Sequence, residues 1–262
     1  MKIAIAAVPA LLIVSICVAL YLGAQIEQEE SRPIEGEVTV PEMVDFLNKL
    51  NQMIGERSFS SEEGIRALRQ TSAMIQGTLG PENLGYRIFT SQADPAVGLL
   101  WETIWIEVGE VDEEDPLIVA IPYGEGGTEV AFGLGVAEYL TSHAPGNPMQ
   151  LVFYPPLVEG DAAEWVRQRT RKEEAAAGVL FVRSGENTGG WGTIEATGKS
   201  VSRVDDLLSR KGWNEQLVRD EELKPQTTIL LGEGKGSNKE EHAGDLLRVM
   251  PFLKALVEEL SL

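Results

Sequence analysis

The sequence LIVAIPY (residues 117–123) is an unbroken apolar run, which is typical of a central β-strand buried on both faces. A second run of the same kind is MQLVFYP at 149–155. Between them, a Gly-rich loop at 124–127 leads into a helical pattern over about 130–142, and PGNP at 145–148 ends it. Strand, helix and strand at this spacing predict a right-handed crossover between parallel strands.

The same alternation continues toward the C-terminus. A helical pattern over 161–174 is followed by the apolar strand GVLFV at 178–182. A helix near 201–211 is followed by the strand TTILL at 227–231, and a closing helix is expected from about 245 to 260. This half of the chain therefore predicts further parallel strands covered by helices.

Two helices and a half-buried strand precede the central run. The first helix, after Pro41, has apolar residues at helical spacings: Met43, Leu47, Leu50 and Ile54. The second follows the capping sequence SSEE at 60–63. An extended segment begins with GYRIF at 85–89, and WETIWIEV at 101–108 alternates like a strand with one buried face. We expect a three-layer α/β/α domain over residues 41–262, with a mainly parallel, mixed central sheet.

The N-terminus carries a membrane-spanning pattern. Residues 3–24 are apolar almost throughout, and 22 helical residues reach about 33 Å, enough to cross a bilayer core. Lys2 on the N-terminal side predicts a single-pass anchor (1–24) with the domain on the extracytoplasmic, periplasmic side. A signal peptide cleaved near 22–24 is the alternative. Residues 25–40 are polar and acidic and are expected to form a linker.

The charge and cysteine content limit the function classes. The 262-residue chain carries a formal charge of −19, which repels nucleic acid, so no nucleic-acid partner is expected. Its one cysteine, Cys17, lies inside the apolar N-terminal segment. Residues 41–262 therefore contain no disulfide, no thiolate metal ligand and no cysteine nucleophile.

The order of elements resembles the zinc aminopeptidases, the di-zinc exopeptidase family that also contains the glutaminyl cyclases. The resemblance rests on the segment ERSFSS at 56–61, on the helix that ends before GY at 85–86, and on the strand that ends at 122. It covers nearly all of the chain after residue 41. It implies an exopeptidase-like fold and a di-zinc site at the ends of the strands.

The positions that match the family's zinc ligands carry no suitable side chain. The family places His-x-Asp at the end of the first central strand, where this chain reads PYG at 122–124. A bridging Asp precedes a Gly-Val-Ala helix start, a Glu pair follows the next strand, and a further Asp follows the third. The degenerate former-ligand positions are Pro122, Gly124, Ala131, Leu157, Val158 and Arg183. The resemblance therefore implies a degenerate member with no catalytic residue, no metal site and no cofactor.

Neighbouring carboxylates leave a different metal open. Glu125, Glu129, Glu159 and Asp161 follow predicted strands and could hold Ca²⁺ or Mg²⁺. His143 is expected to be an exposed cap at the end of a helix, and His242 to lie in a loop.

Two functions follow. The first is a non-catalytic binding or assembly module, anchored in the membrane, that binds a protein partner at or near the membrane. Its candidate binding rim is Tyr123, Glu125, Leu157, Glu159 and Trp191, where aromatic and apolar groups replace the family's polar ones. The same side chains could instead pack inward. The alternative function is a divergent metallopeptidase or amidase with a rebuilt site.

Overall fold

The computed structural model describes residues 38–93, 101–109, 116–124, 127–155, 178–185, 192–197, 200–211, 216–220, 227–232 and 239–260. The predicted anchor and most of the predicted linker precede this part of the chain. None of the described helices is long and apolar enough to span a membrane. The anchor at 1–24 therefore stays a prediction from the sequence.

One eight-stranded mixed sheet organises the described residues, with the spatial order β1-β2-β4-β3-β5-β8-β6-β7. Its strands are β1 (Phe89–Ala93), β2 (Trp101–Val108), β3 (Leu117–Pro122), β4 (Met149–Tyr154), β5 (Gly178–Gly185), β6 (Gly192–Thr197), β7 (Gln216–Asp220) and β8 (Thr227–Gly232).

The centre of the sheet is parallel and its margins are mixed. β3 pairs in parallel with β4 and with β5, and β5 pairs in parallel with β8. β2 joins β4 antiparallel, β1 joins β2 antiparallel, and β6 joins β8 antiparallel. The mainly parallel core predicted from the four apolar runs is thus confirmed.

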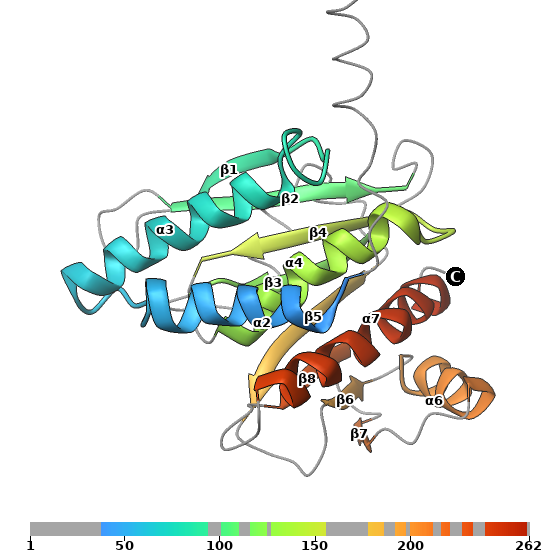
Figure 1. The fold of residues 1–262 in the computed structure, drawn as a ribbon. Coiled ribbons are helices and arrows are strands. Elements are labelled where there is room, and N and C mark those ends of the chain that lie inside the picture. The colour runs from blue at the N-terminus through green and yellow to red at the C-terminus, as the bar shows by residue number, and fades with distance from the viewer. Residues whose placement is uncertain are drawn as a thin grey trace, which may run out of the picture. The chain divides into compact units, whose positions relative to one another are not determined.

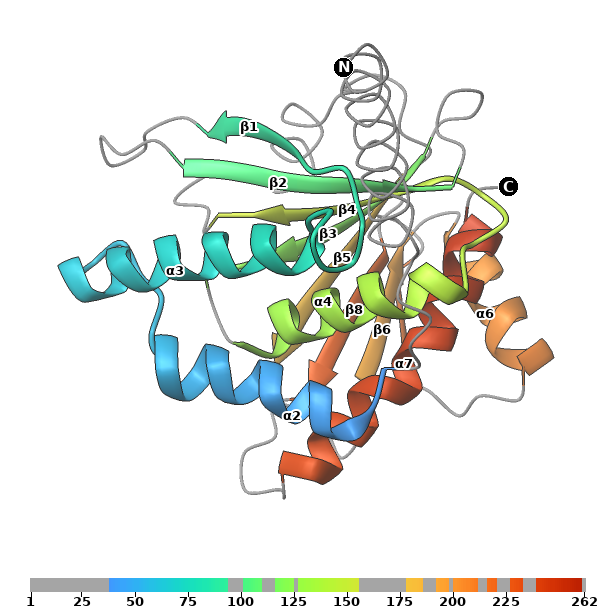
Figure 2. The same cartoon turned by 45° about the horizontal axis from the view of Figure 1, so that its top comes forward.

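The described helices are α2 (Val40–Asn48), which continues as the π-helix η1 (Lys49–Ile54), α3 (Glu62–Leu79), α4 (Gly127–Ser142), α6 (Ser200–Lys211) and α7 (Lys239–Leu260). Figures 1 and 2 show α2, α3, α4 and α7 over one face of the sheet, and α6 contacts α7. The predicted three-layer fold has a second layer of helices on the other face of the sheet. The helix predicted at 161–174 would belong to that layer, but it lies outside the described residues. The described residues therefore show an α/β fold with helices over one face of the sheet, and the three-layer prediction stays untested.

Local sequence explains where the N-terminal helices begin. At α2, the side chains of Thr39 and Glu42 form a capping box, and the Glu42 carboxylate accepts the Thr39 backbone N–H at 2.7 Å. At α3, the Ser61 hydroxyl accepts the Gly64 backbone N–H at 3.0 Å. These caps satisfy backbone donors that the first helical turns leave free.

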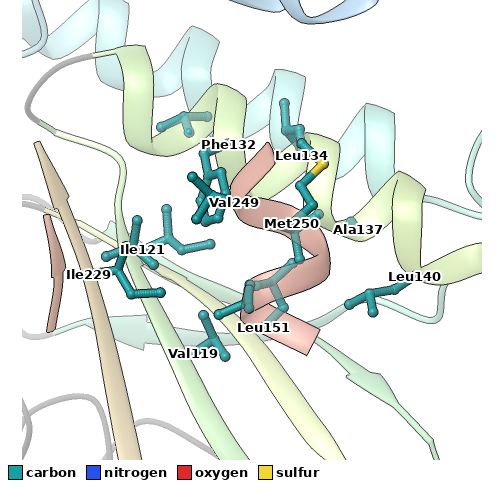
Figure 3. Close-up of a cluster of buried hydrophobic side chains, with 14 of the residues drawn as sticks. Val119, Ile121, Phe132, Leu134, Ala137, Leu140, Leu151, Ile229, Val249 and Met250 are labelled. Carbon is teal, nitrogen blue, oxygen red and sulfur yellow. The ribbon is translucent and has the colours of Figure 1, made fainter. Parts of the chain in front are cut away.

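The helix-side core lies between the sheet and the helices α4 and α7. Figure 3 shows Val119, Ile121 and Leu151 of the strands opposite side chains of α4 and α7, among them Phe132 and Val249. Gly133 of α4 permits this close approach, because a Cβ there would lie 2.8 Å from the Phe153 ring. A glycine at this position therefore lets α4 pack directly on β3 and β4.

The opposite face of the sheet is also buried. One cross-strand row on that face joins β1, β2, β4, β3 and β5 in register and consists of Phe89, Trp105, Val152, Ala120 and Phe181. Trp105 is 5% exposed and Val152 is fully buried. The central strands are thus buried on both faces, as their unbroken apolar sequences predict.

Candidate functional site: the C-terminal edge of the sheet

The end of β3 is the segment where the sequence resemblance predicts the first degenerate zinc-ligand positions. Its side chains alternate between the two faces. Ile121 and Tyr123 belong to the helix-side core, so Pro122 and Gly124 turn to the other side. The ends of β3 and β4 stay joined, because the Tyr123 backbone N–H donates to the Tyr154 carbonyl at 3.0 Å. The strand end is present, and the two positions that the sequence resemblance matches to zinc ligands carry a proline ring and a glycine.

Tyr123 packs inward. Its side chain is fully buried, and its hydroxyl donates to the Glu102 carbonyl on β2 at 2.8 Å. Burial is the main cause that raises the phenol pKa above its ordinary value, and the Glu102 charge adds to it. Of the two expectations for Tyr123, inward packing describes this structure.

Two other former-ligand positions lie at different places in the fold. Ala131 is fully buried in the second turn of α4, within the helix-side core, and not at the edge of the sheet. Arg183 is exposed near the end of β5, with its guanidinium carbon 5.6 Å from the Phe181 ring centroid. Leu157 and Val158, and the rim candidates Glu125, Glu159 and Trp191, lie outside the described residues.

A buried charge pair, which the sequence analysis did not single out, lies beside this edge. Arg57 is 5% exposed and Glu129, in the first turn of α4, is fully buried. The Arg57 guanidinium donates to the Leu50 carbonyl at 2.8 Å and to the Gly55 carbonyl at 3.2 Å. Burial lowers the pKa of Arg57, and the Glu129 charge opposes that shift. The sequence feature that could have pointed to Arg57 is the segment ERSFSS at 56–61, where an arginine follows the end of a helix.

The helix η1 and the first turn of α7 complete the described part of the edge. The Asn51 side chain lies against Gly127, the first residue of α4. Lys239 begins α7 and donates to the Asn48 side-chain carbonyl at 2.7 Å. His242 was expected in a loop, but it lies in the first turn of α7, because the helix begins six residues before the expected Asp245.

An exposed apolar side chain also lies here. Met53, on η1, is 78% exposed, whereas the other large apolar side chains of the described residues are at least partly buried. Met53 lies two residues after Asn51, whose side chain touches the start of α4. Sequence periodicity could not identify it, because a π-helix shifts side chains away from the α-helical positions.

The described edge residues do not fit a zinc ion. Zinc is held by imidazole, thiolate and carboxylate groups. The positions at the ends of β3 and β5 supply Pro122, Gly124 and the Arg183 cation, and the Tyr123 phenol points to the other face. Within the described ranges, no three His, Cys, Asp or Glu side chains gather as a metal site would require.

No family model and no curated protein matches the chain. Several solved structures do match it. The chain is similar to a glutaminyl cyclase from Tannerella forsythia, with TM-score 0.55 and 12% identity over 85% of this chain and 99% of that one. A leucine aminopeptidase precursor from Bacteroides thetaiotaomicron gives TM-score 0.53 and 12% identity over 85% and 98%.

A zinc-dependent exopeptidase from Parabacteroides distasonis gives TM-score 0.52 and 10% identity over 86% and 99% of the two chains. At these identities the likeness shows the fold alone. The predicted resemblance to zinc exopeptidases and glutaminyl cyclases is confirmed at that level.

Proposed function

We propose that the chain is a non-catalytic, membrane-anchored module that binds a protein partner with the rim of an exopeptidase-like sheet. The observation that carries the proposal is the end of β3. Its strand end and its pairing with β4 persist, while Pro122 and Gly124, which share the ligand side, have no donor atom. A hydrolase of the di-zinc type needs ligands at these places. A retained fold without them favours binding over catalysis.

The described rim supplies one contact suited to a partner. Met53 is flexible, polarisable and 78% exposed, and methionines are common on adaptable binding surfaces. Trp191, in a Gly-rich loop of the sequence, is the second proposed contact, since aromatic residues often carry most of the energy of an interface. Glu125, Leu157 and Glu159 would complete the rim. The formal charge of −19 favours a protein partner over nucleic acid.

The location is part of the proposal. An anchor at 1–24 would hold the domain on the extracytoplasmic side, and a linker at 25–40 would keep the rim near membrane proteins. Protease added to spheroplasts should therefore digest the domain and leave the anchor in the membrane fraction. A domain that resists protease until the membrane is broken would place it on the other side.

Site-specific photocrosslinking tests the rim. A photoreactive amino acid replaces Met53 or Trp191 in the full chain, and a control replaces Gln70, which is exposed on α3. The two rim positions should capture the same membrane-associated protein, and the control should not. The same capture pattern at all three positions, or capture at Gln70 alone, would contradict a binding rim.

A further inference from the structure

The first turns of α4 and α7 meet at a histidine. His242 is the fourth residue of α7, and Thr128 is the second residue of α4. The His242 Nε2 atom lies 3.4 Å from the Thr128 hydroxyl oxygen. Thr128 is buried and the imidazole is half-buried. One imidazole therefore joins the starts of two helices at the rim.

This position disfavours a proton on the imidazole. A helix N-terminus carries the positive end of the helix dipole, so a cation there is destabilised, and His242 is close to two such ends. When Nε2 is unprotonated, the Thr128 hydroxyl can donate to it, and protonation would reverse that hydrogen bond. Burial lowers the pKa of His242, and the nearby Asp245 charge opposes this shift.

Other charged groups lie on the helices packed around His242. The Glu129 carboxylate of α4 interacts electrostatically with the Arg57 guanidinium, which lies in the loop before α3. On α7, Lys239 donates to Asn48 of α2. The remaining charged residues with described side chains on the neighbouring helices are Glu42, Asp45, Lys49, Glu138, Asp205, Asp206, Arg210, Glu240, Glu241, Asp245, Arg248, Lys254 and Glu258. Asp45 bonds to Lys49, and Asp245 bonds to Arg248. Asp245 alone among these groups has a resolved effect on His242.

We propose that His242 is a proton-sensitive contact between α4 and α7: neutral, it joins the two helix starts at the rim, and acidification loosens them. The contact exists in the fold whether or not the rim binds a partner. Its consequence rests on the proposed function, because a loosened α4 start would change the surface next to Asn51 and Met53. Partner binding at the rim would then weaken in acid.

The effect of pH on stability follows from the linkage between folding and protonation of His242. In the unfolded chain a histidine titrates near its ordinary pKa of about 6.5. Because the folded pKa of His242 is lower, the unfolded state binds a proton first as the pH falls. The stability contributed by the contact is complete above that ordinary value, and it is lost as the pH falls below it.

The chain contains two histidines, which gives the test a matched control. His143 lies at the other end of α4, where its ring stacks on Tyr139 with 4.2 Å between ring centroids. The full chain, with ¹³C-labelled histidine, is titrated by NMR, and H143Q assigns the two signals. Amide exchange in the first turns of α4 and α7 is measured at about pH 7.5 and about pH 5.5, on either side of the ordinary histidine pKa. H242Q, which keeps a polar amide, is measured in the same way.

The proposal predicts a His242 titration midpoint below about 6.5. It also predicts lower amide protection at both helix starts in acid, where protection is the exchange rate relative to the intrinsic rate at the same pH. H143Q should keep this loss of protection and H242Q should lose most of it. A His242 midpoint at or above the ordinary value would overturn the proposal, and so would an equal loss of protection in H242Q. These readouts need no partner, so they can fail while rim crosslinking succeeds, and the reverse.

Discussion

The Tyr123 hydroxyl donates a hydrogen bond to the main-chain carbonyl of Glu102, with 2.8 Å between the two oxygens. The bond starts just beyond β3 and reaches β2, and β4 lies between these two strands in the sheet. The Glu102 carboxylate in turn accepts the Gln76 side-chain amide of α3 at 3.1 Å. Tyr123 therefore joins the end of β3 to the start of β2 across β4, and its buried side chain offers no surface to a partner.

Removing the Tyr123 hydroxyl should destabilise the fold and spare rim binding. Tyr123→Phe loses a buried hydrogen bond, with an expected cost of about 1 kcal/mol in the free energy of unfolding. Tyr123→Ala also leaves a cavity, with an expected cost of about 3–5 kcal/mol. Urea unfolding of the full chain measures both, with Tyr139→Phe on the partly exposed face of α4 as control. Unchanged stability in Tyr123→Ala would show that Tyr123 is not a core residue.

Buried phenols also predict loss of stability in alkali. The Tyr86 hydroxyl donates to the Ala137 carbonyl at 2.8 Å, and burial raises the pKa values of Tyr86 and Tyr123. The unfolded chain loses these protons near pH 10, before the folded chain does, so stability should fall as the pH rises above about 10. The variant with Phe at both positions should show a shallower alkaline fall in melting temperature. An equally steep fall in that variant would assign the loss to other groups.

The buried pair of Arg57 and Glu129 should act as a unit. Replacing one partner leaves the other charge buried, with an expected cost of about 3–5 kcal/mol for Arg57→Met or Glu129→Leu. Arg57→Met also removes the donor to the carbonyl of Leu50, the second residue of η1. The double variant should therefore cost clearly less than the sum of the single variants. Additive costs in denaturant unfolding would mean that the two charges do not interact.

Gly133 is required for the contact between α4 and the sheet. A Cβ at this position would lie 2.5 Å from the Ile121 Cδ1 atom and 2.8 Å from the Phe153 ring. Gly133→Ala should therefore destabilise the fold by about 1–3 kcal/mol. Gly77→Ala in α3 is the control, because nothing lies within 4 Å of its Cβ and alanine favours a helix. Comparable stabilisation by both variants would refute a tight α4–sheet contact.

The parallel core could be predicted because its strands are continuous apolar runs. LIVAIP became β3 and MQLVFY became β4, and the two pair in parallel from Leu117 opposite Met149 onward. The strands β6 (GTIEAT) and β7 (QLVRD) were not predicted, because their short, mixed sequences gain strand structure from pairing with each other and with β8.

The site was harder to predict, because the spacing of residues in the sequence does not show which way each side chain points in the fold. Counting back from Gly135 placed a bridging position at Ala131, which lies inside α4 because this helix begins at Gly127. Tyr123 was predicted either to lie on the rim or to pack inward, and period-two alternation with Ile121 turns it into the core. The Arg57 and Glu129 pair joins residues far apart in the sequence, so only the fold brings them together.

Zinc content tests the central claim most directly, namely that an exopeptidase-like fold persists here with its zinc positions degenerate. The full chain is equilibrated with excess zinc, dialysed against zinc-free buffer, and analysed for metal per folded chain. Because Pro122 and Gly124 supply no ligand atom and Arg183 supplies a cation, we predict no stoichiometric zinc. One or two zinc ions retained per chain would contradict the account and would indicate a rebuilt metal site.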